Sequence, residues 1–268
     1  MQGDSIIAEL YKGTDFASEE KHFAKTELDN TAGGFAVTKK YWLGTDRFGR
    51  DILSRLIIGV RVSLFVGLVA LVISLFIGVF LGAIAGYFRG WVDEAVMWLI
   101  NVFWAIPTLL LAMGLYVGVG GLIDSKLLLI FIAVGLTMWV DVARLVRGQF
   151  ILLREMEFVT AASSMGFSNM RTIFIHILPN AIGPIIVVAC SNFANAILVE
   201  SGLSFIGLGI QPPAPSWGGM LNEYRDFIDS NKAFLALAPG LAIMLLVLAF
   251  NLVGNGLRDA LDVKGKTA

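Results

Sequence analysis

Charge, cysteine and histidine are all scarce in this sequence. Only 15% of its 268 residues are charged, and the formal net charge is −1. Nucleic-acid binding demands a basic face, so this balance argues against nucleic acid as a partner. The single cysteine, Cys190, excludes a disulfide within the chain and disfavours a cysteine-based metal site. With only His22 and His176, and no paired His and Glu at metal spacing, we expect no metal site.

Catalytic motifs are missing as well. The sequence contains no Gly-x-Ser-x-Gly nucleophile turn. Gly265-Lys266-Thr267 looks like the end of a phosphate-binding loop, but position 260 is Ala instead of Gly and no helix can follow. We therefore expect no catalytic residue and no cofactor bound by this chain.

Apolar residues, in contrast, are abundant. They make up 57% of the chain, and the mean hydropathy is +0.78, which exceeds what a soluble domain needs for its core. A helical membrane span takes about 20 mostly apolar residues. Five segments qualify, at about 62–88, 94–118, 127–147, 176–200 and 234–256. Because a helix satisfies its own backbone amides in lipid, we expect an all-α polytopic membrane protein.

Basic residues are distributed unequally between the two sides of these spans. The polar loop from Gln149 to His176 and the other segments on its side hold eight Lys or Arg residues, namely Arg89, Arg144, Arg147, Arg154, Arg171, Arg258, Lys264 and Lys266. The short loops on the opposite side hold three, namely Lys126, Arg225 and Lys232. Since short cytoplasmic loops are enriched in Lys and Arg, the polar loop and the C-terminus are predicted to be cytoplasmic. Five spans then place the N-terminus outside.

The spans divide the chain into four parts. We expect residues 1–40 to form a polar N-terminal tail and residues 41–61 a junction segment outside the cytoplasm. Residues 62–263 form the expected transmembrane domain, and residues 264–268 form a cytoplasmic tail. Nothing near Met1 resembles a signal peptide that would carry the first part across the membrane. We therefore expect a further apolar span to be encoded upstream of Met1.

Two patterns within the spans predict helix packing. Gly78, Gly82 and Gly86 recur every four residues, which leaves one face of a helix bare for the close approach of a neighbour. Asp141 and Arg144 are three residues apart, close enough on a helix to pair. A structural ion pair near the inner interface is favoured over a transport role.

Further polar residues lie at the depth of the spans. They are Asn101, Asn192, Asn195 and Glu200. Polar groups are costly in lipid, so these side chains could line a polar path, but hydrogen bonding between helices explains them equally well. Both interpretations stay open.

The polar loop carries the most informative pattern. It reads Glu157-Phe-Val-Thr-Ala161-Ala162-Ser-Ser-Met165-Gly166 and is followed by Leu178-Pro179. Small residues at consecutive helical positions let another protein surface approach closely. A loop between spans with this composition indicates a docking site on the water side.

These residues resemble a known family. Glu157, Ala161, Ala162, Gly166, Leu178 and Pro179 match the cytoplasmic signature of the membrane subunits of binding-protein-dependent ABC importers. Further matches are Gly44-Thr45-Asp46, Gly49-Arg50-Asp51, Ala143-Arg144-Leu-Val-Arg147-Gly148-Gln149, Leu203-Ser-Phe205 with Pro212-Pro213-x-Pro215-Ser-Trp217-Gly218, and Asn255-Gly-Leu-Arg258-Asp259-Ala-Leu-Asp262. Together they resemble the dipeptide, oligopeptide and nickel permease branch, specifically its second membrane subunit, over residues 41–263. His176 departs from the general signature, which has an apolar residue there.

The resemblance implies a permease fold with six spans, of which the first is missing here. It implies that a cytoplasmic coupling helix from Glu157 to Met165 seats in a cleft of an ATPase, and that Gly166 ends this helix in a left-handed turn. The implied partners are a second permease subunit, two cytoplasmic ATPase subunits that bind ATP and Mg, and an extracytoplasmic solute-binding protein. ATP-driven closure of the ATPases would move the coupling helix and the attached spans. The implied location is the bacterial or archaeal plasma membrane.

Other functions are weighed against this resemblance. A nickel or other small-solute importer shares the same motifs, so the substrate stays open. An ion-coupled secondary transporter would show inverted repeats and charges at the midplane, whereas we find no repeat and place the few charges towards the ends of the spans. An intramembrane enzyme would need catalytic residues that the sequence lacks.

Overall fold

The computed structural model describes residues 5–12, 15–24, 41–211, 214–228 and 232–261. The chain forms two units, Met1–Gly44 and Thr45–Ala268. In the first unit, strands β1 (Ser5–Lys12) and β2 (Asp15–Ala24) pair antiparallel, with an irregularity in register between Glu9 and Tyr11. The polar tail predicted over residues 1–40 thus contains a hairpin in its described part, which was not expected because charged residues interrupt its β-branched and aromatic residues.

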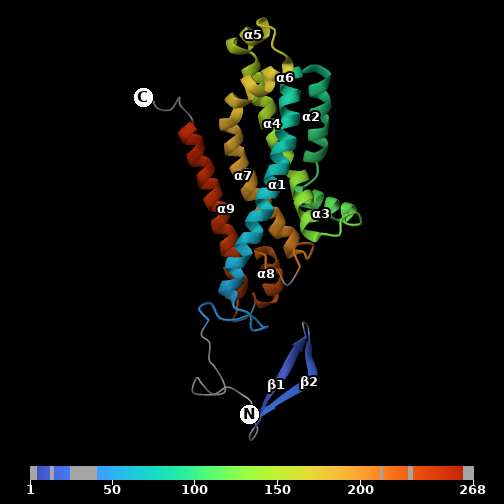
Figure 1. The fold of residues 1–268 in the computed structure, drawn as a ribbon, viewed down its shortest axis with the longest axis vertical. Coiled ribbons are helices and arrows are strands. Elements are labelled where there is room, and N and C mark those ends of the chain that lie inside the picture. Colours follow the sequence, from blue (N-terminus) through green and yellow to red (C-terminus); the bar gives the residue numbers. More distant parts are fainter. Residues whose placement is uncertain (1–4, 13–14, 25–40, 212–213, 229–231, 262–268) are drawn as a thin grey trace. The chain divides into compact units, whose positions relative to one another are not determined.

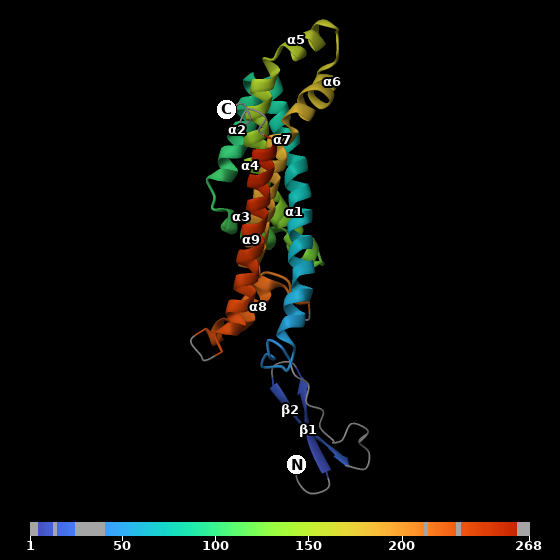
Figure 2. The same cartoon turned by 90° about the vertical axis from the view of Figure 1, so that its left-hand side faces the viewer.

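The regular elements in the described part of the second unit are helices, as the apolar composition predicts. Its elements are α1 (Ile52–Phe88), α2 (Gly90–Trp104), α3 (Thr108–Val119), α4 (Lys126–Arg154), α5 (Glu157–Ser164), α6 (Asn169–Arg171), a π-helical turn (Thr172–Ile177), α7 (Leu178–Phe205), α8 (Trp217–Tyr224), a 3-10 turn (Arg225–Phe227) and α9 (Phe234–Leu261). Figure 1 shows α1, α4, α7 and α9 running along one bundle, with α5 and α6 at one end and α8 at the other. Figure 2 shows the same separation of α5 from α8 after a quarter turn.

Four helical segments of the described chain are long and apolar enough to cross a membrane. They are α1, α4, α9 and the segment Asn169–Phe205. The expected span at 94–118 is instead two helices, α2 and α3, bent by 93° at their junction. Pro107 explains the break, because proline lacks an N–H donor and disfavours helical geometry at the residue before it. Counting the bent pair as one span gives five.

The close contact between α1 and α4 is made through the predicted glycine stripe. A Cβ atom placed on Gly78 would lie 2.5 Å from Cβ of Val142, and one on Gly82 would lie 2.5 Å from the carbonyl oxygen of Ala143. A Cβ on Gly86 would lie 2.6 Å from the carbonyl oxygen of Arg147. Any side chain at these positions would collide with α4, so the two backbones can approach this closely only at glycine.

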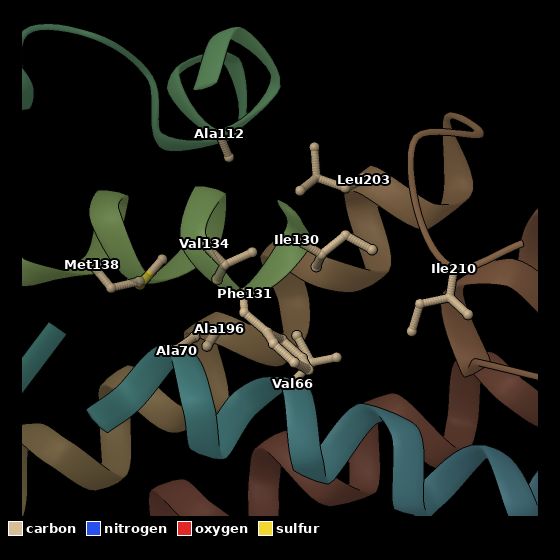
Figure 3. Packing of buried hydrophobic residues seen from close by; sticks show 10 residues of the cluster. All are labelled: Val66, Ala70, Ala112, Ile130, Phe131, Val134, Met138, Ala196, Leu203 and Ile210. Atoms are coloured by element: carbon tan, nitrogen blue, oxygen red, sulfur yellow. The ribbon is translucent and has the colours of Figure 1, made fainter. Parts of the chain in front are cut away.

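A central apolar cluster joins four helices and the chain after α7. Figure 3 shows its members, Val66 and Ala70 of α1, Ala112 of α3, Ile130, Phe131, Val134 and Met138 of α4, Ala196 and Leu203 of α7, and Ile210. Many other large apolar side chains stay exposed, including Phe76 of α1, which is 76% exposed. A soluble protein would bury such residues, so these surfaces suit lipid or another subunit.

Candidate functional site

The short helix α5 is closed at its C-terminus by a specific hydrogen-bond pattern. Gly166 has a φ of 76°, the left-handed conformation that glycine adopts without a side-chain penalty. The N–H of Phe167 donates to the carbonyl of Ala162 at 3.2 Å, and the N–H of Gly166 donates to that of Ser163 at 3.0 Å. This pair of bonds is the Schellman motif, which satisfies the last carbonyls of a helix. At the other end, Glu157 places a carboxylate in the first turn, where the helix dipole favours it.

The two sides of α5 have different environments. Glu157, Ala161 and Met165 are exposed and four residues apart, so they share one face. Ala162, in contrast, is only 1% exposed, and Val159 is also buried. We expected both alanines to meet a partner, but the structure separates them: Ala161 faces outward and Ala162 packs inside the chain.

The buried side of α5 is anchored to the ends of the long helices. Val159 belongs to an apolar cluster with Tyr87 of α1, Phe150 of α4 and Ile177 of the π-helical turn. Leu178 is half-buried and packs against the same cluster, whereas Pro179 is exposed in the first turn of α7. The signature residues therefore divide into a structural group and an exposed group.

Polar contacts tie the neighbouring helix ends together. The Tyr87 hydroxyl donates to Oδ1 of Asn169 in α6 at 3.0 Å. Arg89, between α1 and α2, donates to Oε1 of Glu155 at 2.6 Å and to the carbonyl of Ile151 at 3.2 Å. The guanidinium of Arg154 lies over the Tyr87 ring. The end of α1 is thus bound both to the end of α4 and to the segment that follows α5.

The return from α5 to α7 is also fixed. The rings of Phe167 and His176 stack with centroids 5.4 Å apart and an interplanar angle of 3°. Arg171 lies over the same Phe167 ring at 4.3 Å. The side chain of Asn180 donates to the carbonyl of His176 at 2.7 Å. His176 therefore has a stacking role at the position where the general signature has an apolar residue.

The four polar residues expected along a pathway lie in α2 and α7 and differ in burial. Asn192 is buried and its amide donates to the carbonyl of Met138 in α4 at 2.9 Å, which favours the helix-to-helix hydrogen bond over the pathway. Glu200 is fully buried and accepts a hydrogen bond of 2.7 Å from Ser204. Asn101 in α2 and Asn195 in α7 are exposed.

The expected ion pair between Asp141 and Arg144 is not formed in the described structure. The Arg144 guanidinium lies over the ring of Trp104, 4.1 Å from its centroid, because the end of α2 brings this ring beside α4. The ion pair of this region joins Arg147 of α4 to Asp93 of α2 instead, with an Nη2 to Oδ2 distance of 2.6 Å. Sequence spacing predicted that Arg144 pairs with Asp141, the nearest carboxylate in the chain. In the folded chain the ion pair of this region is instead made by Arg147, and its carboxylate is that of Asp93.

A buried charge network lies at the end of the bundle that holds α8. Asp46 is buried and accepts hydrogen bonds from Nε of Arg50 at 2.7 Å and Nη1 of Arg55 at 2.8 Å. Both arginines also bind Glu223 of α8, and Arg55 does so at 2.7 Å. Burial by itself would raise the pKa of Asp46, but hydrogen bonds from Arg50 and the Phe48 backbone outweigh it and hold this pKa below its usual range. The sequence alone predicts only a junction segment over residues 41–61 here, and not this network.

A metal site would need several ligating side chains close together. Within the described ranges, no group of three or more His, Cys, Asp or Glu side chains could hold one. The described residues of the site offer packing surfaces and hydrogen bonds, and α5 leaves the face formed by Glu157, Ala161 and Met165 exposed.

Long apolar helices with exposed flanks define a polytopic helical membrane protein, and a short anchored helix is held beyond one end of its bundle. The chain belongs to the family of binding-protein-dependent transport system inner membrane components, whose sequence pattern matches residues 78–264. It is a multi-pass inner-membrane protein and a permease subunit of an ABC importer of the dipeptide and oligopeptide branch.

Individual relatives agree with this assignment. The dipeptide transport system permease protein DppC of Alkalihalophilus pseudofirmus is 44% identical over 245 residues, covering 91% of this chain and 78% of the relative. The glutathione transport system permease protein GsiD of Pectobacterium atrosepticum is 42% identical over 228 residues, covering 85% and 74%. GsiD of Escherichia coli is 42% identical over 241 residues, covering 90% and 77%.

Solved structures agree on the fold. The MetNI methionine ABC transporter in an inward-facing conformation is similar with a TM-score of 0.65 at 17% identity, covering 78% of this chain and 97% of that chain. An amino acid ABC transporter is similar with a TM-score of 0.57 at 18% identity, covering 78% and 95%. The expected ABC importer permease fold is thereby confirmed.

Proposed function

We propose that this chain forms half of the translocation pathway of an ATP-driven importer for dipeptides or oligopeptides. The names of its relatives support a peptide substrate, because one is a dipeptide permease and the others are glutathione permeases. Glutathione is itself a small peptide. A substrate class shared at more than 40% identity over most of the chain is the simplest inference for this protein.

The proposed complex contains four further kinds of contact. A second permease subunit completes the pathway, and two cytoplasmic ATPase subunits bind ATP and Mg and carry out hydrolysis. An extracytoplasmic binding protein delivers the solute. Lipid covers the remaining apolar surface. The absence of a phosphate-binding loop from the sequence supports hydrolysis by a partner. The basic loops near α5 support a cytoplasmic position for α5 and for the C-terminus.

The exposed face of α5 is the proposed contact with the ATPase. Glu157, Ala161 and Met165 form it, and Ala161 permits close approach while Glu157 offers a charge to a basic partner. The single observation that carries this proposal is the contrast between that exposed face and the buried Val159 and Ala162 behind it. Because α5 is packed against the long helices on one side, a movement of the ATPase at its exposed side would be transmitted to the spans.

The test uses the complete complex, assembled with the ATPase, second permease and binding protein encoded beside it, in proteoliposomes. ATP-dependent uptake of the dipeptide Ala-Ala is expected, and uptake of nickel ions in its place would contradict the peptide assignment. Ala161→Arg should abolish uptake and weaken co-purification of the ATPase, because a long charged side chain holds the partner away. Ser163→Arg is the matched control, exposed on another side of the same helix. Normal uptake with Ala161→Arg would remove α5 from the proposed role.

A further inference from the structure

A cavity of about 160 Å³ lies where the bend between α2 and α3 meets α4. Its wall includes the ring of Trp104, the backbone turn at Pro107, Thr108 at the start of α3, and Thr137 and Asp141 of α4. Residues of α2 and of α3 both line the cavity, so it depends on the break in the span expected at 94–118. Figure 1 shows this place, where α2 gives way to α3 beside α4.

Asp141 is the charged residue of this wall. It lies near the midpoint of α4 (Lys126–Arg154) and is exposed. Among the described residues it makes no hydrogen bond and no ion pair, because Arg144 is turned onto Trp104 and Arg147 pairs with Asp93. An unpaired carboxylate within a membrane helix is expensive unless it faces water or a cationic ligand.

The break between α2 and α3 carries a second free-energy cost at the same place, independent of the cost of the Asp141 carboxylate. Ala105, Ile106 and Pro107 leave the helical path and are exposed. Non-helical backbone at membrane depth is tolerated where it is buried in protein or lines a water-filled cavity. These residues are exposed on this chain, so they are left to meet water or the proposed second permease subunit. The exposed carboxylate and the exposed break line the same cavity, which suits a water-filled passage between this chain and the second subunit.

We propose that this cavity is a binding site on the translocation pathway for the positively charged amino group of the transported solute. The inference rests on the proposed import function. Asp141 supplies the counter-charge, the Trp104 ring forms an apolar wall beside it, and Thr137 and Thr108 complete the lining. The volume is below the roughly 300 Å³ of a pocket that encloses a whole small ligand, so the site takes the amino end alone.

The first experiment measures the charge preference of the cavity without transport. In the complete complex carrying Cys190→Ala, Thr108→Cys provides a single thiol in the cavity wall among the chain's own residues. The rate of labelling by 2-aminoethyl methanethiosulfonate, a cation, is compared with that by the anionic 2-sulfonatoethyl reagent. The cation should react faster, and Asp141→Asn should lower the ratio of the two rates by roughly fivefold or more. Asp124→Asn, an exposed carboxylate of a loop, should leave the ratio unchanged.

The second experiment separates failure of the site from failure of the function. Uptake of Ala-Ala is measured for the complex with Asp141→Asn, with Asp141→Glu and without either change. Loss of uptake in the first variant and retention in the second supports the site. If the unchanged complex moves no peptide, the proposed function fails, whatever the labelling shows. If the complex is active but Asp141→Asn alters neither uptake nor the labelling ratio, or if the anionic reagent reacts faster, the amino-group site is wrong.

Discussion

The hydroxyl of Tyr224 donates a hydrogen bond of 3.1 Å to Oδ2 of Asp46, although 178 residues separate them in the chain. Arg55 also binds both of these side chains. Through this triangle, the segment before α1, the first turns of α1 and the end of α8 form one unit. Burial raises the pKa of the Tyr224 phenol above its usual value, so it stays a neutral donor to the carboxylate.

The network predicts a pH dependence of stability. The pKa of Asp46 is lower in the folded protein than in the unfolded chain, where it is about 3.9. Asp46 therefore stabilises the fold above that value, and the stabilisation is lost as the pH falls through the folded pKa. Asp46→Asn should lower the stability at pH 7 by roughly 2 kcal/mol, because two arginines lose a charged partner. The melting temperatures of the unchanged protein and of Asp46→Asn in detergent should approach each other as the pH falls below about 4. A difference in melting temperature that stays constant down to about pH 3 would contradict this.

The two alanines of α5 should respond differently to the same enlargement. Ala162→Leu should destabilise the protein by about 1 to 3 kcal/mol, because the added methine and two methyl groups must enter a packed interior. Ala161→Leu adds the same atoms to an exposed position and should leave the melting temperature nearly unchanged. Thermal unfolding of the purified protein measures both. Equal effects would mean that α5 is not held on one side.

The glycine stripe offers a sharper packing test. Gly82→Ala places a methyl group 2.5 Å from the carbonyl oxygen of Ala143 and should force α1 and α4 apart, at a cost of about 1 to 3 kcal/mol. Gly114→Ala is the control, because a Cβ atom there meets nothing within 4 Å and alanine favours the helix. The comparison is made by melting temperature, and a Gly82→Ala protein as stable as the control would refute the close approach.

Tyr87 should link α1 to α6, the short helix that follows α5. Tyr87→Phe removes the hydrogen bond to Asn169 and keeps the ring within its apolar cluster. We expect little change in stability, since such a bond contributes about 1 kcal/mol, but a drop in the peptide transported per ATP hydrolysed. Uptake and ATP turnover are measured together in proteoliposomes. Tyr116→Phe, in the central apolar cluster, should leave the ratio intact.

Much of the fold could be predicted from the sequence, because long apolar runs permit few structures in lipid. The stripe of Gly78, Gly82 and Gly86 indicated a close helix contact, and α4 provides it. The helix predicted from Glu157 to Met165 is present as α5. These features depend on local composition and helical period, which a single sequence contains.

The parts that sequence reasoning missed depend on distant residues. The run 94–118 is apolar apart from a few residues such as Glu94, Asn101 and Thr108, so hydropathy gave no sign of the break that Pro107 makes. Arg144 had Asp141 three residues away, but the ring of Trp104, forty positions earlier, occupies it. A helical wheel does not show whether Ala161 or Ala162 faces the interior. The residues that cover the buried side of α5 come from α1, α4 and the π-helical turn, which are distant in the sequence or outside the helix.

The glycine contact between α1 and α4 also sets the mechanical behaviour of the protein. Helix α1 has 37 residues and is therefore a rod of about 55 Å, fastened sideways to α4 near the end that holds α5. Such a rod acts as a lever: a tilt of about 5° imposed near α5 moves its far end by about 5 Å, roughly the rise of one helical turn. That far end carries Arg55, which binds α8 through Glu223. We therefore expect a small tilt applied beside α5 to become a larger displacement beside α8.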